Sequence, residues 1–151
     1  MQKQILVAVD GSSISSAALK EAIELARERQ AKVRVIHVVD SPYAYPDVLY
    51  GQFSADLEVV RKAWREAGQK VLDQAVAMAR EGGVHPESAL LESQAKRLSS
   101  LIVEEAQRWG ADLIVVGTHG RRGLEGIWLG SVAEGVARTA PVSVLLVRGR
   151  R

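Results

Sequence analysis

The sequence predicts an α/β fold built on a five-stranded parallel sheet with helices on both faces. Five short apolar runs alternate with four helical patterns along the 151 residues. The runs are rich in β-branched residues and lack clean apolar–polar alternation, which is typical of parallel strands covered on both faces. Strands that alternate with helices are joined by right-handed crossovers, so the order β-α-β-α-β-α-β-α-β predicts a doubly wound sheet.

The expected elements follow one another without a boundary that would indicate a second domain, so we expect one domain over residues 1–151. The strands are expected at residues 5–9, 33–39, 88–92, 113–116 and 142–147, and the helices at residues 13–29, 54–81, 98–109 and 131–139. Glycines after the second and third helices, and Pro141 after the fourth, are typical stop signals.

The second expected helix carries an apolar stripe, and a long irregular connection precedes it. The stripe consists of Leu57, Val60, Trp64, Ala67, Val71, Ala75 and Met78. The connection covers residues 40–53 and contains Pro42 and Pro46. Loops of this length are uncommon and often functional, and the role of this one stays open.

Composition excludes several classes of protein. The chain has no cysteine, which rules out disulfides, thiolate metal sites and cysteine nucleophiles. A net charge of +2 gives no electrostatic footprint for nucleic acid. No stretch approaches the roughly 20 apolar residues of a spanning helix, and the first apolar run is too short for a secretion signal. We therefore expect a cytoplasmic protein that binds neither nucleic acid nor membrane.

A glycine-rich loop follows the fourth expected strand and carries the main functional signal. Residues 117–131 read GTHGRRGLEGIWLGS, with five glycines. Backbone N–H groups of such a loop and of the next helix favour anions. The loop has no Gly-Lys-Ser/Thr ending of a P-loop and no G-x-G-x-x-G fingerprint. In open α/β sheets ligands bind beyond the carboxyl ends of the strands, which is where this loop is expected. The loop is therefore expected to be an anion-binding site, with a plain turn as the alternative.

The spacing of these glycines resembles the pattern of the ATP-binding branch of the universal stress proteins. That pattern is G-2x-G-9x-G-[S/T], which Gly117, Gly120, Gly130 and Ser131 match in full. The resemblance also covers the segments at residues 9–12, 37–39, 110–120, 130–134 and 140–142, nearly the whole chain. It departs after the third strand, where the family often has a Gly-x-Pro-like segment and this chain reads ESQAKR. The resemblance implies a Rossmann-like sheet of order 3-2-1-4-5, similar to adenine nucleotide alpha hydrolases.

The resemblance also implies a set of nucleotide-binding residues. The adenine and ribose pocket would be lined by Ala8, Val9, Asp10 and Val38, with Val116 and Val132 at its edges. The glycines would let the backbone approach ribose and phosphate, where a side chain would collide with the ligand. The set is Ala8, Val9, Asp10, Val38, Val116, Gly117, Thr118, His119, Gly120, Arg121, Gly130, Ser131 and Val132. For three of these a plainer role stays open: Asp10 as a cap of the first helix or turn, His119 as a residue that shapes the backbone, and Arg121 as a solvated cation.

By resemblance the ligand is ATP, with AMP or ADP as alternatives, and Mg²⁺ or Mn²⁺ bound through the phosphates. The loop has no P-loop lysine, and no catalytic residue or protein metal ligand is evident, so we expect a regulatory or stress-response protein with little or no hydrolysis. Two alternatives remain: a weak ATPase that uses Glu125 or Glu134, and a chaperone-like dimer that works without nucleotide. The strand from Val142 to Val147 would be an apolar sheet edge, so a homodimer through this strand is expected.

Overall fold

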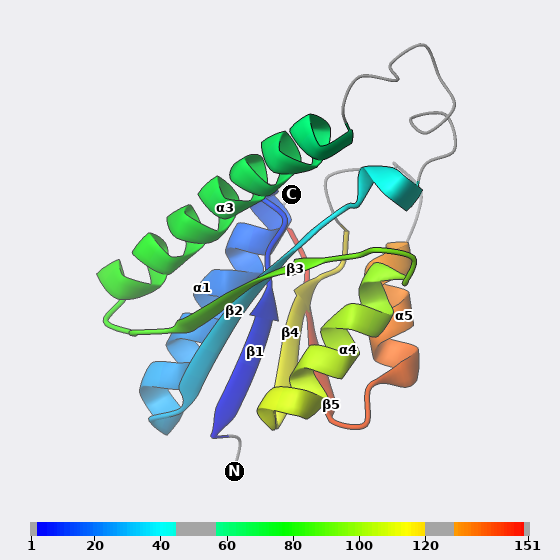
Figure 1. The fold of residues 1–151 in the computed structure, drawn as a ribbon. Helices are drawn as coiled ribbons and strands as arrows, with labels where there is room; N and C mark the ends of the chain where they lie inside the picture. Colours follow the sequence, from blue (N-terminus) through cyan, green and yellow to red (C-terminus); the bar gives the residue numbers. More distant parts are fainter. Residues whose placement is uncertain (1–2, 45–56, 120–128, 150–151) are drawn as a thin grey trace.

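The computed structural model describes residues 3–44, 57–119 and 129–149. Its five strands form one parallel sheet of order β3-β2-β1-β4-β5, which confirms the expected fold class and strand order (Figure 1). The strands are β1 (Gln4–Ala8), β2 (Lys32–Val39), β3 (Glu87–Glu92), β4 (Leu113–Gly117) and β5 (Ser143–Val147). The helices are α1 (Ser13–Arg29), the short 3-10 helix η1 (Pro42–Ala44), α3 (Leu57–Glu81), α4 (Leu98–Trp109) and α5 (Ser131–Thr139).

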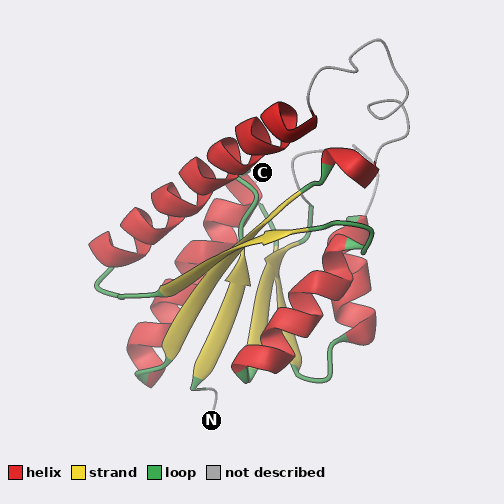
Figure 2. Ribbon diagram, in the orientation of Figure 1, coloured by secondary structure: helices red, strands yellow, loops and turns green. Residues whose placement is uncertain are grey.

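Helices cover both faces of the sheet (Figure 2). Ile5 and Val7 of β1 pack in a cluster with residues of α1 and α3, on what we call the α1/α3 face. Leu6, between them, packs with residues of α4 and α5, on the α4/α5 face. Successive strand residues point to opposite faces and both faces are covered, which explains why Ile5, Leu6 and Val7 at the centre of the strand are all apolar and buried.

The expected bounds of α1, α4 and α5 are confirmed, since local signals end these helices. Ser12 caps the start of α1 by accepting a hydrogen bond from the N–H of Ser15. Gly110 ends α4 in the left-handed conformation, with φ of 82°. Of the second expected helix, residues 57–81 are helical and residues 54–56 lie outside the described part.

The expected apolar stripe of α3 is off by one position at its centre. Ala67 is exposed, whereas its neighbour Gly68 is buried together with Leu72, Ala75 and Ala79. A β-carbon at position 68 would collide with Val39 and lie 3.0 Å from Cδ2 of His37. The missing side chain therefore lets α3 lie close against β2, and this contact selects the buried face.

The segment after β3, where the chain departs from the family pattern, forms a tight turn. The N–H of Ser93 donates to the carbonyl of Val39 at 2.9 Å, and the N–H of Lys96 donates to the carbonyl of Ser93 at 2.9 Å. Gln94 takes the left-handed conformation with φ of 28°. One of these hydrogen bonds closes the turn, and the other attaches its first residue to the end of β2.

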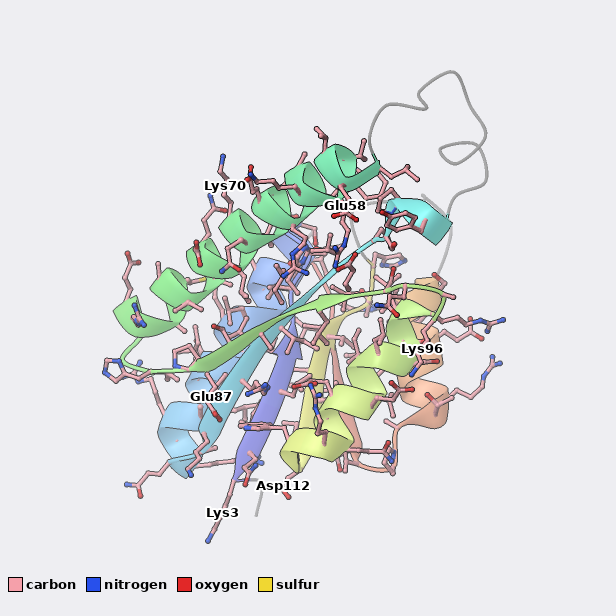
Figure 3. The ribbon with its side chains drawn as sticks, in the orientation of Figure 1. Lys3, Glu58, Lys70, Glu87, Lys96 and Asp112 are labelled. Carbon is pink, nitrogen blue, oxygen red and sulfur yellow. The ribbon has the colours of Figure 1, made fainter. Side chains whose placement is uncertain are left out.

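Figure 3 labels residues that form hydrogen bonds at the two ends of the sheet. At the amino end, Oδ2 of Asp112 accepts hydrogen bonds at 3.0 Å from the N–H groups of Lys3 and Gln4. At the carboxyl end, Glu58 at the start of α3 accepts a hydrogen bond from the hydroxyl of Tyr43 in η1 at 2.7 Å.

None of the described helices combines the length and apolar character that crossing a membrane requires.

Candidate functional site

The candidate site lies at the carboxyl edge of the sheet, where β1 and β4 end side by side. The two strands are paired, with Val7 opposite Val115. After β1 the chain turns toward β2 on one side, and after β4 it turns toward β5 on the other. This is the topological switch point, the place where open α/β sheets bind ligands. The segments that follow these strands begin at Val9 and Thr118, so the fold brings together residues that the sequence places far apart.

Four of the residues expected around the adenine and ribose pocket lie on one face of the sheet. They are two of the four expected to line the pocket and the two expected at its edges. Ala8, Val38, Val116 and Val132 all pack with the α4/α5 face. Val116 is 3% exposed, and the other three are half-buried. They provide an apolar surface that reaches the carboxyl edge.

Val9 differs from these four because its side chain lies in the cluster on the α1/α3 face. Its N–H donates to the carbonyl of Ile36 at 2.9 Å, and its carbonyl accepts a hydrogen bond from Nδ1 of His37 at 2.7 Å. Since a carbonyl only accepts, His37 carries its proton on Nδ1 in this contact. Val9 therefore fixes the path of the chain into the site, and its side chain points away from those four residues.

Asp10 belongs to the turn that starts α1. Its Oδ1 accepts a hydrogen bond from the N–H of Ser12 at 2.9 Å, and its own N–H donates to Oγ of Ser15 at 3.2 Å. Gly11, between them, takes φ of 84°. Ser12 is the helix cap, and Asp10 holds the turn that precedes it, with its half-buried carboxylate just beyond the end of β1.

The two ends of the glycine-rich loop are tied together at Thr118. The N–H of Thr118 donates to the carbonyl of Val147 at 2.9 Å, and its carbonyl accepts the N–H of Gly130 at 2.7 Å. Its hydroxyl is hydrogen bonded to Nδ1 of His119 at 3.2 Å. Thr118 is only 6% exposed. This residue therefore closes the base of the loop and attaches it to β5, a role that the motif itself did not reveal.

Two of the motif glycines lie close to other parts of the chain, which the sequence did not predict. A β-carbon at Gly117 would lie 2.6 Å from Cγ2 of Ile14, and one at Gly130 would lie 3.1 Å from the carbonyl oxygen of Thr118. A side chain at either of these two positions would therefore crowd atoms of the protein itself. Gly120 and Arg121, and the alternative catalytic residue Glu125, lie outside the described residues.

The start of α5 lies at the base of the loop, where the N–H of Gly130 donates to the carbonyl of Thr118. Gly130 is the N-cap and makes no side-chain capping hydrogen bond. The first N–H groups of a helix have no partner within the helix, and they carry the positive end of its dipole. Ser131 is the first residue of α5 and is exposed. Such a terminus is suited to bind an anion.

One of the two candidate bases, Glu134, lies among the described residues. Glu134, a candidate base, is 52% exposed and forms an ion pair with Arg138 one turn along α5. Among residues 3–44, 57–119 and 129–149, no three His, Cys, Asp or Glu side chains come together in an arrangement that holds a metal ion.

One ion-pair cluster borders the site where β3 ends. Glu92 accepts hydrogen bonds from Arg61 at 2.7 and 3.0 Å and from Arg65 at 3.1 Å. The hydrogen bonds from Arg61 hold the pKa of Glu92 below its ordinary value. The cluster fastens the first turns of α3 to the end of β3.

Comparison with known proteins gives matches along nearly the entire chain. The model of the universal stress protein family matches residues 1–148. A universal stress protein of Methanocaldococcus jannaschii is 40% identical over 149 residues, which cover 98% of this chain and 83% of that protein. Among solved structures, a member of the family from Burkholderia pseudomallei has 35% identity and a TM-score of 0.75, covering 95% of this chain and 94% of that one.

A further solved structure contains a ligand. The universal stress protein from Archaeoglobus fulgidus in complex with dAMP has 29% identity and a TM-score of 0.67, and the match covers 96% of this chain and 97% of that one. Adenine nucleotide binding is therefore found among the relatives of this chain.

Proposed function

Because this chain belongs to the universal stress protein family, we propose that it binds ATP at the carboxyl edge of its sheet and acts as a nucleotide-dependent regulatory protein. The observation that carries the proposal is the hydrogen bond from Gly130 to Thr118 at 2.7 Å. This bond sets the start of α5 beside the end of β4, and β4 is paired with β1, the strand that leads to Asp10. A helix start that can bind an anion, near a group of apolar side chains, matches the two parts of a nucleotide.

The proposed orientation follows from the chemistry of these parts. The adenine ring lies against the apolar surface of Ala8, Val38 and Val116, and the ribose lies toward Asp10. The phosphates reach the N–H groups at the start of α5, where Ser131 adds a hydroxyl. A Mg²⁺ or Mn²⁺ ion is carried by the phosphates themselves, since no cluster of protein ligands is present among the described residues.

The same features favour binding over hydrolysis. Phosphoryl transfer needs a positioned base or water-orienting group and a held metal. The carboxylate of Glu134 is instead paired with Arg138. We therefore expect little or no release of phosphate when the protein is incubated with ATP and Mg²⁺, and steady turnover that Glu134→Gln abolishes would support an ATPase instead.

The binding site can be tested with a charge that spares the fold. In Ser131→Asp the new carboxylate lies at the start of α5, where it stabilises the helix but repels phosphates. We expect the affinity for ATP, measured by calorimetry, to fall by about tenfold or more, the equivalent of one charged hydrogen bond. The thermal unfolding midpoint should stay the same or rise.

The matched control is Ser100→Asp, which places the same charge on an exposed serine in the first turn of α4. This variant should bind ATP as the wild type does. Adenosine lacks phosphates, so its affinity should not change in either variant. Wild-type protein that binds no adenine nucleotide at millimolar concentration would refute the proposed function.

We also propose a homodimer through β5. This strand forms one edge of the sheet, and its residues Val144, Leu145 and Leu146 are only half-buried in the single chain. A second copy across a two-fold axis would cover this apolar edge. Val144→Lys should then give a monomer in sedimentation experiments, and a wild-type protein that sediments as a monomer at micromolar concentration would count against the interface.

A further inference from the structure

Ile14, the second residue of α1, occupies space that two glycines leave open. A β-carbon at Gly117 would lie 2.6 Å from Cγ2 of Ile14, and a β-carbon at Gly149 would lie 2.9 Å from its Cγ1. Gly117 is the last residue of β4, and Gly149 follows the end of β5. The two branches of one side chain therefore contact two separate segments of the chain.

The two segments that Ile14 contacts are bonded to each other and carry the glycine-rich loop. Gly117 lies opposite Val147 in the sheet, and the N–H of Thr118 donates to the carbonyl of Val147 at 2.9 Å. The carbonyl of Thr118 in turn holds Gly130. A displacement of the end of β4 would consequently move both ends of the loop.

On its other side, Ile14 is fixed to the turn of Asp10. Ser12 caps the helix just before Ile14, and Ser15 just after it donates its N–H to Oγ of Ser12 at 3.1 Å. Oγ of Ser15 also accepts the N–H of Asp10. The turn and Ile14 thus form one hydrogen-bonded unit.

We propose that Ile14 is a positioning residue for nucleotide binding, which sets the distance between the turn of Asp10 and the start of the glycine-rich loop. The inference rests on the proposed function, because it concerns the two parts of the same site. It also predicts that the shape of the side chain at position 14 affects nucleotide binding. The nearest atoms are Cγ1 and Cγ2, and Cδ1 is farther from the added β-carbon at Gly149, at 3.5 Å, so the β-branch matters more than the volume of the side chain. Valine keeps both atoms, whereas leucine keeps the volume and loses the branch.

The other end of α1 offers a matched control. Ile23 is 6% exposed, and a β-carbon at Gly82 would lie 2.7 Å from its Cγ2. The same residue type therefore packs against a glycine in the same way. Ile23 lies near the end of α1 and Gly82 follows α3, so this contact is remote from the start of α1.

The experiment compares Ile14→Leu, Ile14→Val and Ile23→Leu by calorimetry with ATP and by thermal unfolding. We expect Ile14→Leu to bind ATP about tenfold more weakly, since misalignment of one charged hydrogen bond has about this effect. Ile14→Val should remain within about twofold of the wild type, because conservative core changes are tolerated best. Ile23→Leu should lower the unfolding midpoint and leave the affinity unchanged.

Amide hydrogen exchange gives a second measurement that needs no nucleotide. In Ile14→Leu the amides of Thr118 and Gly130, which close the loop, should exchange faster than in the wild type, and in Ile23→Leu they should not. Equal ATP affinity in Ile14→Leu and the wild type would overturn the inference, as would equal losses in the two leucine variants. If the wild type binds no adenine nucleotide, the proposed function fails, and faster exchange in Ile14→Leu alone still shows the positioning contact.

Discussion

Gly130→Ala tests whether closure of the loop base controls the site. The added β-carbon would lie 3.1 Å from the carbonyl oxygen of Thr118 and 3.4 Å from Cα of His119. The backbone at Gly130 has φ of −68° and ψ of 157°, which any residue adopts without strain. The effect of the substitution therefore comes from crowding, which pushes the start of α5 away from Thr118 and stretches the hydrogen bond of 2.7 Å between them.

Three contributions determine the expected loss of stability. Weakening the hydrogen bond costs about 1 kcal/mol, and alanine is a poorer N-cap than glycine by roughly 0.5–1 kcal/mol. Alanine restricts the unfolded chain, which offsets about 0.4–1 kcal/mol. The net loss is about 1 kcal/mol, which for a chain of this length lowers the unfolding midpoint by roughly 2–4 °C.

The affinity for ATP should fall by more than this modest loss of stability accounts for. Calorimetry should show a dissociation constant about tenfold higher, because the N–H groups at the start of α5 no longer align with the phosphates. Gly135→Ala in the same helix is the control. Its β-carbon would lie 2.6 Å from Cβ of Ser99 on α4, so it should destabilise the protein by roughly 1–3 kcal/mol. It should leave the affinity intact.

Two results would refute this reasoning. If Gly130→Ala has the unfolding midpoint and the ATP affinity of the wild type, the closure of the loop base does not control the site. If the two glycine variants lose affinity in proportion to their loss of stability, the effect is a general one.

Three further predictions concern the fold around the site. Arg34 donates one hydrogen bond of 2.9 Å from Nε to Glu105, and its Nη2 lies 2.9 Å from the same carboxylate oxygen. Glu105 is 3% exposed and keeps Arg108 as a partner, so Arg34→Met should lower the free energy of unfolding by about 1–3 kcal/mol in urea. The double variant with Glu105→Leu should recover most of this loss. Because Arg61 lowers the pKa of Glu92, this pair stabilises the fold above the ordinary carboxylate pKa, and the stabilisation is lost as the pH falls through the lowered value. Glu92→Gln should therefore be less stable than the wild type at neutral pH, and the difference should shrink in acid titrations below about pH 5. Gly68→Ala should destabilise the protein by roughly 1–3 kcal/mol in thermal unfolding, because its β-carbon has no room against β2.

Each of these predictions has a result that would contradict it. A double variant no more stable than Arg34→Met would mean that the buried carboxylate is not what makes the single change costly. A stability difference between Glu92→Gln and the wild type that does not vary with pH would exclude the ion pair as its cause. Wild-type stability in Gly68→Ala would mean that α3 shifts along β2 without cost.

Local patterns predicted those features that depend on neighbouring residues. The bounds of α1, α4 and α5 followed from caps such as Ser12 and Gly110, whose hydrogen bonds involve residues a few positions away. The buried face of α3 did not follow in the same way. Ala67 continues the apolar periodicity, yet Gly68 is the residue that meets the sheet. That choice depends on two residues of β2, which no pattern within the helix contains.

The sequence likewise predicted some features of the candidate site and not others. The spacing of Gly117, Gly130 and Ser131 was sufficient to locate the loop and to indicate the family. It did not show that Val9 turns its side chain to the opposite face, nor that Ile14 occupies the space beside Gly117. These are contacts between residues that only the fold brings together.

The sequence by itself determined the alternation of strands and helices, the helix ends and the position of the glycine-rich loop, because short-range periodicity and capping control them. Only the tertiary structure showed which protein atoms lie beside Gly117 and Gly130 and what closes the loop. Those answers depend on atoms such as Cγ2 of Ile14 and the carbonyl of Thr118, whose positions are set by the packing of α1 and α5 against neighbouring strands.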